Sequence, residues 1–228
     1  DRNPIDVATN FNFFNPKAGF IYRIADENSL YLSYARANRE ANRNDFENGV
    51  SSPEVLDDIE FGWRYKNDRI HLNTNIYYMN YKNQLVLTGA IDDVGAPIRA
   101  TSGKSYRLGL EIDANLIVSD QFSIKSNAAF STNKNQDFTA PINGNLINLG
   151  NTPLSFSPNV IAGNMIVYQP NNLQISFLSK YVGEQFMSNL NSSVSKLDVL
   201  DSYFTSDLNF VYEIATEKVF DAIIISGL

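Results

Sequence analysis

The sequence predicts an all-β fold, an antiparallel transmembrane β-barrel to which this chain contributes about ten strands. Three observations predict it: apolar and polar residues alternate along long segments, short and long connections alternate between those segments, and each segment runs to about 9–13 residues. Strands of soluble proteins usually have about 5–6 residues, whereas a tilted strand needs about 9–11 to cross a bilayer. We therefore expect the apolar side of each strand to face lipid.

The clearest alternation lies in residues 105–119, which a short polar turn connects to residues 122–131. In the first segment Leu108, Leu110 and Ile112 alternate with small or charged residues. Because successive side chains of a strand project to opposite faces, this strand has one apolar and one charged face. Two such segments joined by a tight turn predict a long antiparallel hairpin.

Strands before this hairpin are expected at residues 17–25, 29–36, 56–66 and 69–81. Polar turns of two or three residues join the first strand to the second and the third to the fourth. After the hairpin, the same pattern predicts strands over residues 159–168, 173–183, 202–214 and 218–228.

The connections predict which end of the strands faces which compartment. Short turns of about two to five residues alternate with stretches of about 17 to 26, over residues 37–53, 82–104, 132–157 and 184–200. Outer-membrane barrels have short periplasmic turns and long extracellular loops. We expect the same arrangement here.

Composition excludes several classes of function. The formal net charge is −7, which argues against nucleic acid as a partner. The chain has no cysteine and one histidine, His71, so neither thiolate chemistry nor a histidine-based triad or metal site is expected. We predict no catalytic residues, no metal site and no cofactor.

One long connection suggests a ligand contact. Arg36, Arg39, Arg43 and Asn44 follow one another at spacings that could present a single cationic surface to an anionic ligand. The alternative is a solvated loop whose acidic residues, such as Glu40, balance these charges.

Several segments together resemble a known family. Pro53–Glu54 precedes a strand with Glu60-x-Gly62, Gly109-x-Glu111 lies in a later strand, and Pro158 opens another. With residues 15–40, these features resemble the C-terminal part of the β-barrel of TonB-dependent outer-membrane receptors. The high content of Asn and Tyr resembles that of Bacteroidetes-type members of the family.

The resemblance implies that residues 1–228 are a partial barrel domain, about ten strands of a 22-stranded barrel, without the plug domain, the early strands and the closing strands. It implies a location in the outer membrane of a Gram-negative bacterium and active transport of a scarce nutrient, in the first place a ferric siderophore or other iron complex, and not an enzyme. The implied partners are outer-membrane lipid, the nutrient, and TonB with its inner-membrane energising complex, reached through the absent plug. Candidate lumen-lining residues are Arg64, Asn73, Asn75, Arg107, Glu111 and Asp113.

Two other readings remain open at this point. A passive porin-like or structural outer-membrane barrel would use the same strands without a plug. A soluble β-sandwich that binds, for example, glycans would place the apolar faces against a second layer of the same molecule. An outer-membrane hydrolase lacks a credible triad around His71.

Overall fold

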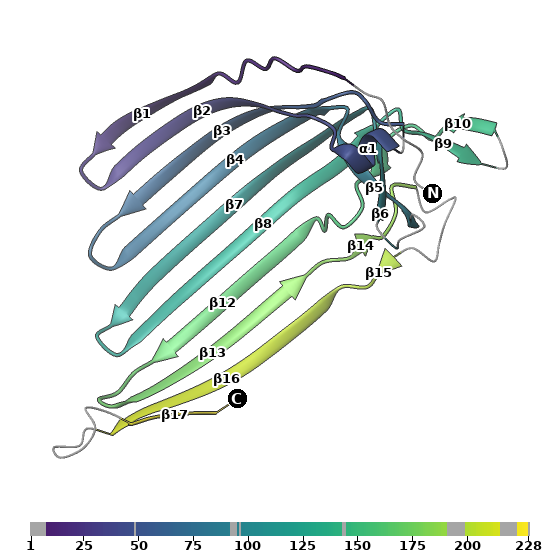
Figure 1. Cartoon of the computed structure of the whole chain (residues 1–228). Helices are drawn as coiled ribbons and strands as arrows, with labels where there is room; N and C mark the ends of the chain where they lie inside the picture. Colours follow the sequence, from purple (N-terminus) through teal and green to yellow (C-terminus); the bar gives the residue numbers. More distant parts are fainter. Residues whose placement is uncertain are drawn as a thin grey trace.

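The computed structural model describes residues 8–47, 49–91, 95, 97–142, 145–190, 199–214 and 223–227. Ten long strands follow one another in one curved sheet in chain order, and every neighbouring pair is antiparallel (Figure 1). The strands are β1 (Lys17–Ala25), β2 (Asn28–Arg39), β3 (Glu54–Lys66), β4 (Ile70–Lys82), β7 (Lys104–Ser119), β8 (Phe122–Gln136), β12 (Val160–Tyr168), β13 (Leu173–Val182), β16 (Tyr203–Ile214) and β17 (Ile223–Gly227).

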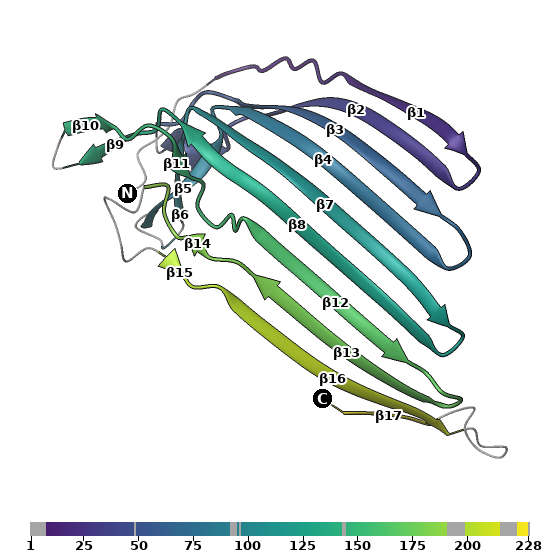
Figure 2. The same ribbon diagram turned by 180° about the vertical axis from the view of Figure 1, so that it is seen from behind.

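The smaller elements lie in the long connections. Both views place them at one end of the sheet and the tight hairpin turns at the other (Figures 1 and 2), which confirms the predicted alternation of short and long connections. These elements are α1 (Arg43–Glu47), β5 (Leu85–Ile91), β6 (Pro97–Thr101), β9 (Thr139–Ile142), β10 (Asn145–Asn148), β11 (Thr152–Pro153), β14 (Gln185–Phe186) and β15 (Val199–Leu200).

The ten expected strands are present, but several are longer than expected. β2 continues to Arg39 and β8 to Gln136, three and five residues beyond the expected ends at 36 and 131. These extensions are polar, so the apolar alternation stops before the backbone pairing does, because ladder hydrogen bonds do not require apolar side chains. Of the last expected strand, residues 218–222 and 228 lie outside the described residues.

The main sheet has two chemically distinct faces. On one, which we call the apolar face, Phe20, Phe61, Ile76 and Phe204 are 65%, 46%, 50% and 63% exposed. On the other, the polar face, lie Asn73, Asn75, Glu111 and Asp113 together with Gly62. Within the described residues the buried hydrophobic residues are only Ala41, Val50, Val86, Ala140, Leu154 and Val182.

No second layer covers the apolar face among the described strands, and the two outermost strands, β1 and β17, each pair with a single neighbour (Figures 1 and 2). The β-sandwich reading is therefore wrong, because a sandwich buries the apolar faces of two sheets against each other. In the described part of the chain, no helix is long and apolar enough to cross a membrane.

Glycines on the polar face let two tyrosine rings lie flat against the sheet. A Cβ at Gly62 would collide with the ring of Tyr31 on β2 and would lie 2.6 Å from the carbonyl oxygen of Thr74. A Cβ at Gly109 would lie 2.6 Å from Cζ of Tyr77. Aromatic side chains that cover glycines on neighbouring strands fix the register of a sheet.

We expect Gly62→Ala to destabilise the barrel by about 1–3 kcal/mol, because the Tyr31 ring can move aside but the Thr74 carbonyl belongs to the backbone. The measurement is the apparent unfolding temperature of the full-length protein in detergent, followed by heat-dependent migration in gels. Gly19→Ala is the matched control, since its nearest new contact would be at 3.9 Å. Equal unfolding temperatures for the two variants would contradict the role of the glycine–tyrosine contact.

Candidate functional site

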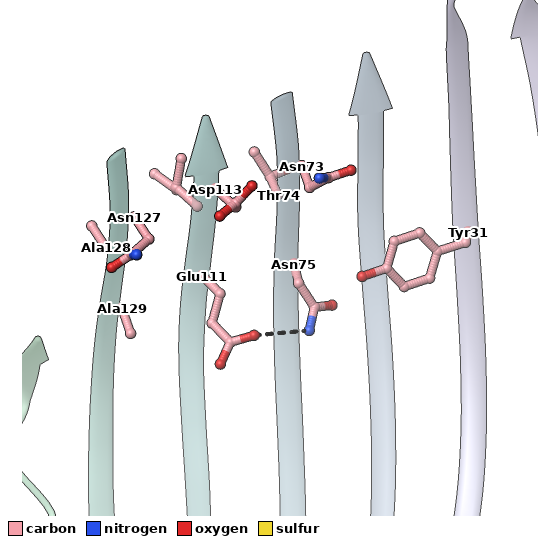
Figure 3. A pocket seen from close by; sticks show the side chains of 10 residues that line it. Tyr31, Asn73, Thr74, Asn75, Glu111, Asp113, Asn127, Ala128 and Ala129 are labelled. Carbon is pink, nitrogen blue, oxygen red and sulfur yellow. Dashed lines mark hydrogen bonds between the residues drawn. The ribbon is translucent and has the colours of Figure 1, made fainter. Parts of the chain in front are cut away.

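A hollow of about 380 Å³ lies on the polar face in the middle of the sheet. Figure 3 shows its side chains coming from four strands, β2, β4, β7 and β8. Half of the ten lining residues have acidic or amide side chains: Asn73, Asn75, Glu111, Asp113 and Asn127, with Tyr31 at one side.

Strand register brings these residues together. Arg64, Asn73, Asp113 and Asn127 stand directly opposite one another along a row that crosses β3, β4, β7 and β8. The adjacent row, two residues nearer the long connections, contains Gly62, Asn75 and Glu111. Since side chains at every second position share a face, each strand contributes only alternate residues to the hollow.

The charges of the hollow are weakly compensated. The amide nitrogen Nδ2 of Asn75 donates to Oε2 of Glu111 at 3.5 Å, a long hydrogen bond (Figure 3). No Lys or Arg within the described residues lies within salt-bridge distance of Glu111 or Asp113. The Arg64 guanidinium instead stacks over the ring of Tyr31, 4.5 Å from its centroid, a cation–π contact.

All six candidate lumen-lining residues lie on the polar face. Five of them gather in or beside the hollow. The sixth, Arg107, lies nearer the long connections, where its Nη1 donates to Oγ of Ser157 at 3.2 Å. The alternation in the sequence is enough to place these residues on one face, but not to place the hollow.

A second hollow, of about 450 Å³, adjoins the first and was not expected from the sequence. Lys125, Lys180 and Asp207 line it, while Met165 and Leu178 give it an apolar floor. Asn127 lines both hollows. The two lysines belong to different hairpins, and only the pairing of β12 with both β8 and β13 brings them together, so no local sequence signal marks this site.

The structure does not bring the three candidate ligand-binding arginines into one cationic surface. Arg36 and Arg39 lie three residues apart on β2, and their side chains therefore occupy opposite faces. Arg43 lies in α1, as does Asn44. Each guanidinium has a carboxylate partner: Arg36–Asp57 at 2.7 Å, Arg39–Glu54 at 3.4 Å and Arg43–Glu47 at 2.9 Å.

The buried side-chain amide of Asn135, at the end of β8 nearest the long connections, forms hydrogen bonds with two of those connections. Asn135 is fully buried, and its Nδ2 lies 3.1 Å from Oγ1 of Thr152, 3.2 Å from the carbonyl oxygen of Pro153 and 3.3 Å from Oδ1 of Asn189. The same Oδ1 of Asn189 accepts from the backbone nitrogen of Ser155 at 3.1 Å. Sequence reasoning missed Asn135, because one asparagine in a polar stretch carries no distinctive pattern.

The residues that line the two hollows offer hydrogen-bond donors and acceptors to hydrophilic groups. No cluster of three or more His, Asp or Glu suited to a metal ion occurs among the described residues. The amide and charged side chains around the two hollows can form hydrogen bonds and electrostatic contacts with groups that lie against the polar face.

Comparison with protein families identifies one match. The family described as "TonB dependent receptor-like, beta-barrel" matches residues 1–222, nearly the whole chain. Among proteins with curated functional descriptions, none matches this chain.

Solved structures share the fold at low sequence identity. The siderophore receptor PiuA from Acinetobacter baumannii has a TM-score of 0.66 at 18% identity over 86% of this chain and 29% of its own. The copper transporter OprC has a TM-score of 0.66 at 16% identity, covering 87% and 31%. The ferric-catecholate import receptor Fiu from E. coli K12 has a TM-score of 0.63 at 15% identity, covering 86% and 28%. The chain thus spans less than a third of the length of each of these proteins.

We expect Asn135→Ala to loosen the loop residues 151–159 and 183–190 while leaving the long strands β12 and β13 between them intact. The substitution removes the shared donor from three acceptors, two of which belong to the buried residues Thr152 and Asn189. Leaving the buried hydroxyl of Thr152 without its donor costs about 1–3 kcal/mol. Hydrogen–deuterium exchange of the full-length protein should therefore accelerate in residues 151–159 and 183–190 and stay unchanged in β12 and β13.

Asn80→Ala is the matched control, because Asn80 lies on the opposite face, where its side chain cannot reach these loops. Unchanged exchange in residues 151–159 and 183–190 of Asn135→Ala would show that Asn135 does not hold the loops.

Proposed function

This chain belongs to the TonB-dependent receptor-like β-barrel family, and on that premise we propose that the protein containing it actively imports a scarce nutrient with energy delivered through TonB. The family is one of receptors and transporters of the outer membrane of Gram-negative bacteria, not of enzymes. The chain is accordingly a β-barrel segment of that membrane.

The observation that carries the proposal is the two-faced single sheet. Its apolar face has no protein cover in the described part of the chain, and its polar face carries two hollows lined in part by charged and amide side chains. A β-structure can cross a bilayer only when every backbone group pairs within a closed barrel. We propose that residues 1–228 form part of such a barrel and that a plug domain, the early strands and the closing strands complete it.

For the cargo we propose an iron complex, in the first place a ferric siderophore. PiuA and Fiu carry siderophore and ferric-catecholate in their names, which supports an iron complex, while OprC, named a copper transporter, has the same fold. The fold therefore supports nutrient uptake but does not distinguish an iron cargo from a copper cargo. Copper is the alternative cargo that the experiment must include.

Roles for the candidate residues follow from their positions. Arg64, Asn73, Asn75, Arg107, Glu111 and Asp113 would line the lumen, because all six occupy the polar face. For ligand contact at the extracellular end we propose chiefly Arg43 and Asn44 of α1, with Arg39 on the polar face beside them in sequence. Arg36 lies on the apolar face, so it would contact only a ligand that extended beyond the extracellular end of β2 to that face.

The proposal is tested with the full-length gene in a host lacking its own receptors for the offered complexes. We expect growth and radiolabelled iron uptake from a ferric siderophore, and loss of both when TonB is depleted. Uptake that is independent of TonB, or swelling of liposomes by small solutes, would instead support the passive porin-like barrel. Uptake of copper alone would contradict the iron cargo but not the transport mechanism.

Two neighbouring alanines on β8 provide a sharper test of the lumen. Ala129 stands beside Glu111 on the polar face, whereas Ala128 stands beside Ile112 on the apolar face. We expect Ala129→Trp to fill part of the hollow and to slow TonB-dependent uptake severalfold, with surface binding of the complex retained.

Ala128→Trp is the matched control, because its ring would extend into the acyl chains, and we expect near-normal uptake. Equal uptake rates in the two variants would show that this face does not border the transport path.

A further inference from the structure

One row of side chains on the apolar face is polar over part of its length. It crosses four neighbouring strands, β8, β12, β13 and β16, where register aligns Ser126, Asn164, Ser179 and Ser206 directly opposite one another. We call these four residues the polar row. Toward β7, β4 and β3 the same line continues with Ala114, Leu72 and Tyr65, so the polar part is confined to the strands from β8 to β16.

The polar row has apolar rows on both sides along the same strands. The row nearer the hairpin turns consists of Ile124, Ile166, Phe177 and Leu208, and the row nearer the long connections consists of Ala128, Ala162, Tyr181 and Phe204. Rows on one face lie about 7 Å apart, since each residue of a strand advances about 3.4 Å. The polar row therefore lies at a depth where lipid offers acyl chains and no hydrogen-bond partners.

Asn164 carries an unsatisfied hydrogen-bond donor into this surface. Its neighbour Gly163 belongs to the polar face, where a Cβ would lie 2.9 Å from Oδ1 of Asn127, so alternation directs the Asn164 side chain to the apolar face. Oδ1 of Asn164 accepts from Oγ of Ser126 at 2.6 Å, but among the described residues Nδ2 has no acceptor. Because an unpaired amide in hydrocarbon is costly, this group favours a protein surface that supplies a partner.

A second copy of the same barrel supplies that partner at the right depth. Two copies in one membrane share the loop-out orientation, so the two-fold axis that relates them runs along the membrane normal and leaves depth unchanged. The polar row then meets a polar row, and apolar rows meet apolar rows. A carboxamide is both donor and acceptor, so Asn164 is complementary to its own copy. Neither the polar row nor its two flanking rows carries a charge that would require a partner of opposite sign.

We propose that the apolar face of β12 and β13 is the contact surface of a homodimer within the membrane, with Asn164 of each copy beside the two-fold axis. Four strands about 4.8 Å apart and five rows about 7 Å apart present roughly 650 Å² per copy, near the lower end for specific interfaces. Since acyl chains are as apolar as the flanking side chains, the polar row rather than the apolar area determines where the copies meet. The dimer is therefore reversible. The inference rests on the membrane location of the apolar face and is independent of the transported nutrient.

The test uses full-length protein in liposomes, with donor and acceptor dyes on separate samples and energy transfer measured against the protein-to-lipid ratio. Asn164→Leu should raise the apparent dissociation constant of the dimer at least about fivefold, because two symmetry-related contacts are lost. Thr74→Leu is the matched control: Thr74 lies on the apolar face of β4, away from β12, and its Oγ1 already donates to the carbonyl oxygen of Trp63 at 3.4 Å. It should dimerise like the wild type, and both variants should keep the heat-dependent gel migration of a folded barrel.

Cross-linking in native membranes locates the contact, in a background without other cysteines. Ser179→Cys, directly opposite Asn164, should form a disulfide-linked homodimer on mild oxidation, whereas Ile76→Cys on the apolar face of β4 should not.

Three results would overturn the proposal: wild-type energy transfer no greater than that of randomly distributed barrels, equal dissociation constants for Asn164→Leu and Thr74→Leu, or equal cross-linking at positions 179 and 76. Cross-linking of position 179 only to a different protein would also overturn it, because the occupant of this surface would then be an unrelated barrel.

Discussion

The structure depends on one constraint: a strand that crosses a bilayer must place all its backbone hydrogen bonds in the sheet and sort its side chains between two solvents. The antiparallel ladder from β1 to β17 meets the first requirement for every strand with two neighbours. Alternation at every second residue meets the second. Few large hydrophobic residues are buried among the described residues, which follows because such a sheet is stabilised by lipid on one side rather than by an apolar protein core.

The polar face has its own order. Its acidic hollow, around Glu111 and Asp113, adjoins a hollow with Lys125 and Lys180, and Asn127 borders both. Among the described residues, Glu111 and Asp113 have no Lys or Arg within salt-bridge distance, and Lys125 and Lys180 have no Asp or Glu within that distance. The charged side chains of the polar face can therefore interact with side chains of another part of the protein or with a solute.

The sequence was sufficient for the strands and for their two faces, since alternation is local and a shift by one residue would place every apolar side chain on the wrong side. It was insufficient where position depends on partners far away in the chain. The second hollow, with Lys125 and Lys180, requires the pairing of β8, β12 and β13, and the hydrogen bond of Asn135 to a loop requires Asn189, fifty-four residues away. The arginines of residues 36–43 show a different limit: treating them as a loop suggested one surface, but β2 continues through Arg39 and alternation separates Arg36 from it.

The central claim is that the apolar face meets acyl chains and the polar face does not. Spin labels placed one at a time at residues 107–116 of the full-length protein in liposomes test it most directly, through relaxation by oxygen, which concentrates in lipid, and by a water-soluble nickel complex. The account predicts strong relaxation by oxygen at positions 108, 110, 112, 114 and 116, and weak relaxation at the odd positions between them. Uniformly weak relaxation by oxygen at the even positions would contradict it, because that side would then be packed against protein.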